Sequence, residues 1–245
     1  MILTADGIAV DGPHGPLLRR TTVRVGSGEV ALVSGAPGAG HTALALALAG
    51  RMRPIHGRVC LDGTDDPALL RRRVAVVDTP GISEPDPVLP LRAVVGEELA
   101  MAGRGTLPRS VVAWLDARGA AGFARTRFED VPAPTRLALM LELAAMRPGV
   151  GVLVLTVPDR HGGSPQQWWP LVAEHAAAGR AVVVTCAQSS AELIGTLTAR
   201  LGGDTDPAPP AAPGGTSGAR HERGPTGTTV QALASHHDDS EGADR

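Results

Sequence analysis

The segment from Val30 to Gly50, which reads VALVSGAPGAGHTALALALAG, constrains the fold more than any other part of the chain. Its apolar start, Val30 to Val33, predicts a buried strand, and its alanine- and leucine-rich end predicts a helix. A glycine-rich turn from Gly35 to Gly40 joins the two. Because the backbone N–H groups of such a turn and of the following helix N-terminus can cradle phosphates, the segment is typical of a P-loop.

One position of this P-loop departs from the usual pattern. His41 stands where lysine normally follows the last glycine, and the chain contains no lysine at all. A neutral imidazole offers one donor without charge, whereas a charge-assisted contact contributes about 1.5–3 kcal/mol. A bound phosphate would raise the pKa of the imidazole and partly restore a cation, or else His41 is only a polar residue tolerated at a helix N-terminus.

The candidate phosphate-binding residues are the glycines of the turn and the residues that begin the helix. They are Gly35, Gly38, Ala39, Gly40, His41, Thr42 and Ala43. The glycines permit close approach of backbone to phosphate, and the hydroxyl of Thr42 is the candidate ligand for Mg²⁺.

The rest of the chain alternates short apolar runs with helical patterns. Strands are predicted at 2–10, 21–25, 56–63, 72–77, 152–155 and 181–184, and helices after Pro67 and at 92–101, 109–117, 135–146, 165–178 and 190–200. Four strands are continuously apolar and separated by helices, which indicates an α/β fold with a mostly parallel sheet covered on both faces. The first two strands predict a short antiparallel pair at the N-terminus.

Composition divides the chain into a core and a tail. The core is predicted to span residues 1–201 and to contain a small helical subdomain at about 84–134. Residues 202–245 are rich in Gly, Pro, Ala, Ser and Thr and have hardly any large apolar side chains. Such a segment buries too little surface to offset the entropy of ordering, so we expect it to be disordered.

Charge, cysteine content and the N-terminal sequence exclude several classes of function. The formal net charge of −2 gives no indication of a nucleic-acid surface. No apolar run is long enough to span a bilayer, and MILTADGIAV has no secretory signal pattern, so we expect a cytoplasmic location. Cys60 and Cys186 lie far apart in apolar surroundings, which favours buried free thiols.

Several segments beyond the P-loop match one family in order and spacing. LRRRVAVV (Leu70 to Val77) is similar to the strand that leads to the family's glutamine loop. VLVLTVP (Val152 to Pro158) lies where the family has its magnesium-binding strand, and VVVTCA (Val182 to Ala187) where it has its switch histidine. Over about residues 1–201 the chain resembles the nucleotide-binding domain of ATP-binding cassette (ABC) proteins. The resemblance implies a P-loop NTPase-like fold, with ATP and Mg²⁺ as cofactors and a membrane permease or another ABC subunit as partner, on the inner face of the cell membrane.

The residues that hydrolyse ATP in that family are replaced in this chain. Asp78 stands at the glutamine position, and Thr156 and Val157 replace the family's Asp–Glu pair, of which only the following Pro158 is kept. Valine can neither orient water nor accept a proton, so the usual general base is missing. Asp159, beyond the proline, is either a substitute acid or an ordinary loop residue.

Two further positions of the resemblance have also changed. The signature loop would fall at Val131-Pro-Ala-Pro-Thr135, where two prolines remove backbone donors. Cys186 lies where the switch histidine would contact phosphate, but cysteine is a weak donor and more typical of a core. Since phosphoryl transfer depends on several groups acting jointly, these losses together predict that the chain does not hydrolyse ATP.

Three functions therefore remain open. The first is an ABC-type subunit of a membrane transport system that binds nucleotide weakly and does not hydrolyse it; the intact glycine turn favours it. The second is a pseudo-ATPase interaction module whose P-loop is empty. The third is a divergent active ATPase that uses Asp78 or Asp159 together with His41.

Overall fold

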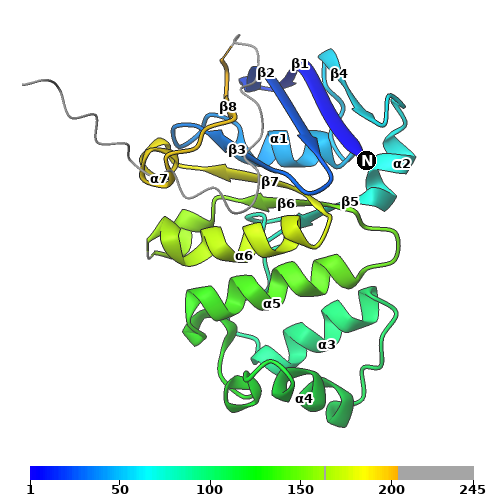
Figure 1. Ribbon diagram of the computed structural model, residues 1–245, viewed down its shortest axis with the longest axis vertical. Helices are drawn as coiled ribbons and strands as arrows, with labels where there is room; N and C mark the ends of the chain where they lie inside the picture. The colour runs from blue at the N-terminus through cyan, green and yellow to red at the C-terminus, as the bar shows by residue number, and fades with distance from the viewer. Residues whose placement is uncertain (163, 204–245) are drawn as a thin grey trace, which may run out of the picture. The chain divides into compact units, whose positions relative to one another are not determined.

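A five-stranded parallel sheet organises the fold, with its strands in the order β5-β6-β7-β3-β8 (Figure 1). The computed structural model describes residues 1–162 and 164–203, so the predicted disordered tail lies outside the described residues from 204 onwards. The strands are β3 (Val30–Ser34), β5 (Val74–Val77), β6 (Val152–Thr156), β7 (Ala181–Cys186) and β8 (Ala199–Arg200). The predicted mostly parallel α/β sheet is thereby confirmed.

Both faces of this sheet are covered, which explains why its strands are continuously apolar. On one side, Val30 and Leu32 of β3 belong to the core formed with helices α5 (Ala133–Met146) and α6 (Pro165–Ala177). On the other side, Ala31 and Val33 belong to a second core, formed with helix α1. Alternate residues of each strand point to opposite faces, so a doubly covered sheet needs apolar residues at every position.

Helix α1 (His41–Leu48), which follows the P-loop, lies in the second core. That core also contains residues of a three-stranded antiparallel sheet in the order β2-β1-β4. Its strands are β1 (Ile2–Gly12), β2 (Gly15–Gly26) and β4 (His56–Leu61). Every residue of α1 from the third onwards is buried, as expected for a helix with sheet residues packed around it. The predicted N-terminal strand pair is confirmed, although both strands are longer than predicted.

The region predicted as a helical subdomain contains α3 (Leu91–Met101) and α4 (Pro108–Asp116), with short 3-10 turns at η1 (Ala121–Phe123) and η2 (Phe128–Asp130). Figure 1 shows these helices on the far side of α5 from the sheet. Helix α2 (Pro67–Arg73) begins at the predicted proline, behind the N-cap Asp66. No helix in the described part of the chain combines the length and the apolar character needed to cross a bilayer.

The predicted last helix, 190–200, is wrong in its second half. Helix α7 (Gln188–Ile194) ends at Gly195, whose φ of 73° is in the left-handed region. The chain then runs beside β3, where the Thr198 N–H donates to the carbonyl of Leu32 over 2.9 Å and the Leu32 N–H donates to the Thr198 hydroxyl over 3.0 Å. These bonds lead into β8, the fifth parallel strand, which was not predicted because its two-residue length gives no sequence pattern.

Candidate functional site

The glycine-rich turn connects β3 to α1 in the way that a P-loop requires. Gly38 has a φ of 81° and Gly40 a φ of 107°, both in a region that other residues rarely adopt. A Cβ at Gly40 would lie 2.4 Å from the carbonyl oxygen of Leu17, so β2 packs against the loop at a point where only glycine fits. A Cβ at Gly38 would meet nothing within 4 Å, so this part of the loop faces open space.

The start of α1 offers backbone donors to a ligand. The first N–H of the helical ladder is that of Leu44, which donates to the carbonyl of Gly40 over 2.8 Å. The N–H groups of His41, Thr42 and Ala43 donate to no acceptor within the described residues. Unpartnered N–H groups at a helix N-terminus, together with the helix dipole, favour an anion at this position.

A cavity of about 480 Å³ adjoins these donors. All the predicted phosphate-binding residues except Ala39 line it. Its other lining residues come from the glycine-rich turn, from β2, from the segment after α1, from the segments after β5 and β6, and from the residue after β7. They are Pro37, Leu17, Met52, Pro80, Val157, Arg160 and Ala187. Space and backbone donors for an anion therefore occur together.

His41 is neutral in this environment. Burial lowers the pKa of its imidazole, although hydrogen bonds with the carbonyls of Ala36 and Gly35 and the charge of Asp159 act in the opposite direction. Nε2 lies 3.2 Å from the Ala36 carbonyl oxygen, which assigns the proton to Nε2. Nδ1 is buried and has no partner among the described residues. Before a ligand binds, His41 thus supplies no positive charge to the P-loop.

The two residues that replace the family's Asp–Glu pair are bonded elsewhere. The Thr156 hydroxyl lies 2.9 Å from the hydroxyl of Thr79, and both residues are fully buried. Val157 has a φ of 45°, unusual for a β-branched residue, and its N–H donates to the carbonyl of Thr185 over 2.9 Å. Neither residue offers an acid or a base to the cavity.

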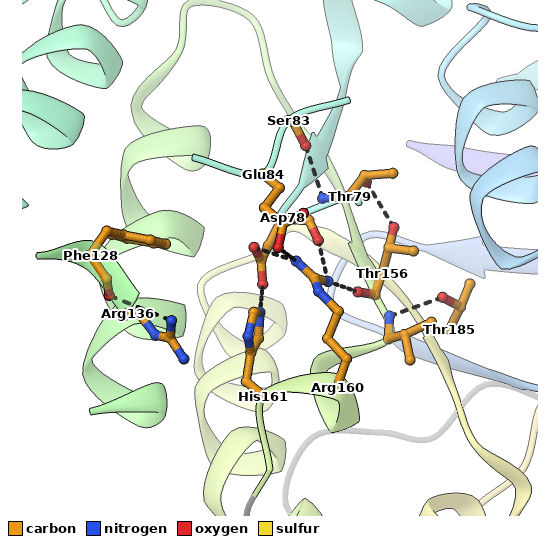
Figure 2. A network of polar contacts seen from close by, with 11 residues as sticks. Asp78, Thr79, Ser83, Glu84, Phe128, Arg136, Thr156, Arg160, His161 and Thr185 are labelled. Atoms are coloured by element: carbon orange, nitrogen blue, oxygen red, sulfur yellow. Dashed lines mark hydrogen bonds and ion pairs between the residues drawn. The ribbon is translucent and has the colours of Figure 1, made fainter. Parts of the chain in front are cut away.

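The residue at the glutamine position, Asp78, belongs to a closed ion-pair network (Figure 2). Its side chain is only 3% exposed, and its two oxygens lie 2.7 Å from Arg160 Nη2 and 2.5 Å from His161 Nε2. Arg160 also donates to the carbonyl of Asp78 over 2.6 Å and to that of Thr156 over 2.9 Å. Glu84 accepts a further bond from Arg160 at 3.2 Å. The carboxylate of Asp78 is therefore neutralised inside the protein.

The carboxylate of Asp159 is hydrogen-bonded within the protein. It accepts the N–H of Ala187 over 2.8 Å and the hydroxyl of Ser190 over 2.7 Å. It thereby joins η3 (Pro158–His161) to the segment that follows β7. Both oxygens of Asp159 are used in these bonds.

Few side chains among the described residues around the cavity could ligate Mg²⁺. This cation prefers carboxylate and phosphate oxygens, and the nearby carboxylates of Asp78 and Asp159 are bonded to protein groups. Among the described residues that line the cavity, Thr42 is the only one with a hydroxyl group, which is the predicted Mg²⁺ ligand. Within residues 1–162 and 164–203, no group of three or more His, Cys, Asp or Glu side chains could hold a metal ion.

Comparison with known proteins gives no match by sequence but clear matches by structure. No protein-family model matches the sequence, and no curated protein matches it. An ATP-binding subunit of an ABC transporter matches with a TM-score of 0.54 and 17% identity, over 79% of this chain and 82% of its own. A dimeric ATP-binding cassette in a post-hydrolysis state, bound to ADP and Pi, matches with a TM-score of 0.57 and 15% identity, over 76% and 88%.

A third match is an ABC transporter ATP-binding protein from Pyrococcus furiosus, with a TM-score of 0.56 and 14% identity, over 77% of this chain and 92% of its own. The chain has the ABC ATP-binding fold. The resemblance predicted from segment order is thus confirmed at the level of the fold.

The remaining predicted positions of the ABC resemblance are not among the residues that line the cavity. In the signature region, Pro132 caps α5 and Pro134 lies in its first turn, so neither contributes a backbone donor. Arg136 lies over the ring of Phe128, 5.5 Å from its centroid. Figure 2 shows the hydrogen bond that Arg136 donates to the carbonyl of Phe128. Cys186 is fully buried in the core, and burial raises the pKa of its thiol to about 12.

Sequence reasoning missed Arg160 and His161, which belong to the site region of this ABC fold. Only a weak signal was present, namely two basic residues shortly after the buried strand β6. Asp78 follows β5, and β5 pairs with β6, so residues after these strands are expected to lie at the same sheet edge. Recognising the network required that pairing, which the sequence does not reveal.

Proposed function

We propose that this chain is a nucleotide-binding, non-hydrolysing subunit of an ABC-type membrane transport system. The observation that carries the proposal is the P-loop, whose left-handed glycines and unpartnered N–H groups adjoin a cavity of about 480 Å³. The ligand would be ATP or ADP, held chiefly by backbone N–H groups through its phosphates. Affinity would be weak because neither lysine nor a positively charged histidine assists the backbone.

The absence of hydrolysis follows from the side chains around the same cavity. Hydrolysis requires a group that positions or deprotonates water and cations that stabilise the leaving phosphate. Val157 occupies the general-base position, and Asp78 and Asp159 are both held by protein donors. These bonds support the non-hydrolysing alternative over a divergent active ATPase. For the same reason we propose that nucleotide binds with little dependence on Mg²⁺.

A membrane permease is the partner that we propose. A groove of about 1000 Å³ lies in the helical region of α3 and α4. Its lining residues include Arg92, Gly96, Glu97, Pro108, Arg109 and Val112. Charges of both signs and exposed apolar groups occur together there, as they do in protein–protein interfaces. ABC domains contact their permeases through this region, so the groove supports transport over the second candidate, an interaction module of another kind.

The decisive experiment is a calorimetric titration of the full chain with ATP and with ADP, with Gly38→Val as the test variant. A Cβ at Gly38 points into the open space that phosphate would occupy, so we expect affinity to fall more than about tenfold. Gly63→Val is the matched control. Gly63 has a φ of 80° and no neighbour within 4 Å, like Gly38, but it lies in the turn after β4.

The results separate the three functions. ATP binding that is lost in Gly38→Val and kept in Gly63→Val supports the proposal. No binding at millimolar ATP favours an empty P-loop. Phosphate release by the wild-type chain that disappears in Gly38→Val would establish an active ATPase and overturn the proposal.

A further inference from the structure

A second cavity, of about 550 Å³, lies at the amino ends of the parallel strands, whereas the P-loop lies at their carboxyl ends. It includes Val74, the first residue of β5, and the loop before β6, Pro148 to Val150. The P-loop instead follows the last residue of β3, and the strands are parallel. The two cavities are therefore separate, and a ligand can occupy one without the other.

The charged residues that line this second cavity are all arginines. They are Arg51, Arg71, Arg72, Arg73 and Arg147, and we call their cavity the arginine pocket. No aspartate or glutamate from the described residues lines it. Leu69, Met101 and Val150 supply apolar wall. In a chain whose formal net charge is −2, this is a local concentration of positive charge.

Backbone carbonyls hold several of these guanidinium groups in place. Arg51 donates to the carbonyls of Ala49 and Val74, both over 3.3 Å. Arg71 donates to the carbonyl of Gly50 over 2.9 Å. Arg73 donates to the carbonyl of Gly149 over 3.2 Å. A carbonyl orients a guanidinium without neutralising it, so the charges stay available and their positions are largely set in advance.

The positive charges of the pocket are mostly uncompensated. Of the arginines in this pocket, only Arg147 has a carboxylate partner among the described residues, namely Glu98 at 2.7 Å, and the Nε of Arg147 is buried without a partner there. The pKa of Arg51 is lowered by burial, and the positive charges of Arg147 and Arg71 lower it further. Like charges held together in this way repel one another, and a bound anion would relieve the repulsion.

We propose that the arginine pocket binds a compact polyanion that carries at least two phosphate charges. Guanidinium forks match phosphate oxygens in geometry, and the volume lies within the usual range for a small-molecule site. The same chemistry is offered by a free di- or polyphosphate and by the headgroup of an anionic phospholipid. The proposal does not depend on nucleotide binding at the P-loop.

The test uses the full chain with Gly38→Val already introduced, so that the P-loop makes no contribution. Inorganic pyrophosphate is titrated calorimetrically into this protein and into a further variant with Arg51→Gln and Arg73→Gln. We expect the two changes to weaken binding at least about tenfold, since charge-assisted contacts are lost. The matched control carries Arg20→Gln and Arg24→Gln, which remove the same charge from exposed residues of β2.

A second arm identifies the source of the phosphate. The same proteins are sedimented with phosphatidylcholine vesicles that contain or lack cardiolipin, an anionic lipid whose headgroup carries two phosphates. Pyrophosphate binding without vesicle binding assigns the pocket to a soluble polyanion, whereas vesicle binding that requires the anionic lipid assigns it to a headgroup. In either case Arg51→Gln with Arg73→Gln must weaken binding and the β2 control must not. Equal loss in both variants, or no binding to either probe, would overturn the proposal.

Thermal unfolding of each variant keeps the interpretation clear. Both double variants remove exposed or half-buried side chains and should unfold cooperatively. Since binding is measured in the Gly38→Val protein, a failure here leaves the P-loop proposal untouched. Conversely, loss of ATP binding in the wild-type chain would not affect the arginine pocket.

Discussion

The P-loop turn and the carboxyl ends of β5 and β6 lie at the same edge of the sheet but differ in whether their polar groups are free to bind a ligand. At the P-loop, the backbone still has the left-handed glycines and the unpartnered helix N–H groups of a phosphate site. At β5 and β6, the side chains form a network in which Asp78, Arg160 and His161 bind one another. The backbone N–H groups of the P-loop are thus available to an anion, whereas the charged side chains at the ends of β5 and β6 are already paired with one another.

This difference shows that fold and chemistry depend on different features of the sequence. The P-loop geometry depends on glycines, and substitution there strains the backbone or fills the space for a ligand. The β5 and β6 ends need only residues whose polar groups are paired, because an unpaired buried carboxylate would be costly. Arg160 meets that requirement for Asp78, so the fold does not require a glutamine at this position.

The largest effect is expected from Gly40→Ala, which tests whether the P-loop backbone is fixed by packing. The new Cβ would lie 2.4 Å from the carbonyl oxygen of Leu17, and a φ of 107° is unfavourable for alanine. We expect a loss of about 3 kcal/mol in the free energy of unfolding, from strain and overpacking together. Urea denaturation measures it.

Gly38→Ala is the comparison for that experiment, because Gly38 shares the loop and the positive φ but has open space around it. Only backbone strain remains, so we expect about 1 kcal/mol. Equal losses at the two positions would show that contact with β2 does not hold the loop.

The sequence was sufficient for the fold but not for the site. Continuous apolar runs such as 152–155 and 181–184 predicted doubly covered strands, because both faces of such strands must be apolar. The glycines predicted the P-loop, because their spacing directly reflects a backbone conformation. By contrast, Asp78 and Arg160 are 82 residues apart, and their contact depends on which strands are neighbours. Strand β8 was not predicted because its two residues give no sequence pattern, and its place in the sheet depends on pairing with the distant strand β3.

An intermediate effect is expected from Asp78→Asn, which tests whether the β5 and β6 ends are held by charge. Asn tolerates the φ of 52° at this position, so the change removes the charge without adding backbone strain. Arg160 keeps its bonds to two carbonyls but loses its buried counter-charge. We expect a loss of about 2 kcal/mol in the free energy of unfolding.

A matched control for Asp78→Asn is Glu98→Gln, which removes the carboxylate partner of Arg147 at the same 2.7 Å separation. Glu98 has one arginine partner, whereas Asp78 has both Arg160 and His161. A smaller loss for Glu98→Gln would confirm that the network at β5 and β6 is more than an ordinary ion pair. If Asp78→Asn leaves the free energy of unfolding unchanged, the charge of Asp78 does not stabilise the fold, and the network only fills the space at the ends of β5 and β6.

The smallest expected effect is on the pH dependence of stability, which reports how far the folded protein lowers the pKa of His41. Burial lowers the pKa of His41 and, on α6, that of His175. In the unfolded chain both imidazoles regain their ordinary pKa near 6.5. Below that pH the unfolded chain therefore binds more protons than the folded chain. Stability should therefore fall as pH decreases through about 6.5 toward the lowered folded values, and these groups should contribute no slope well above that range.

His41→Gln and His175→Gln should each make the free energy of unfolding less dependent on pH between about 7.5 and 5.5. Denaturation midpoints at several pH values measure this. If His41→Gln has no effect on the slope, the imidazole is not held neutral by burial, and a positively charged His41 could replace the missing lysine. If His41→Gln does reduce the pH dependence, adding ATP to the wild-type chain should reduce it as well. A bound phosphate raises the pKa of the His41 imidazole toward its ordinary value, so the folded and unfolded chains then bind protons more equally.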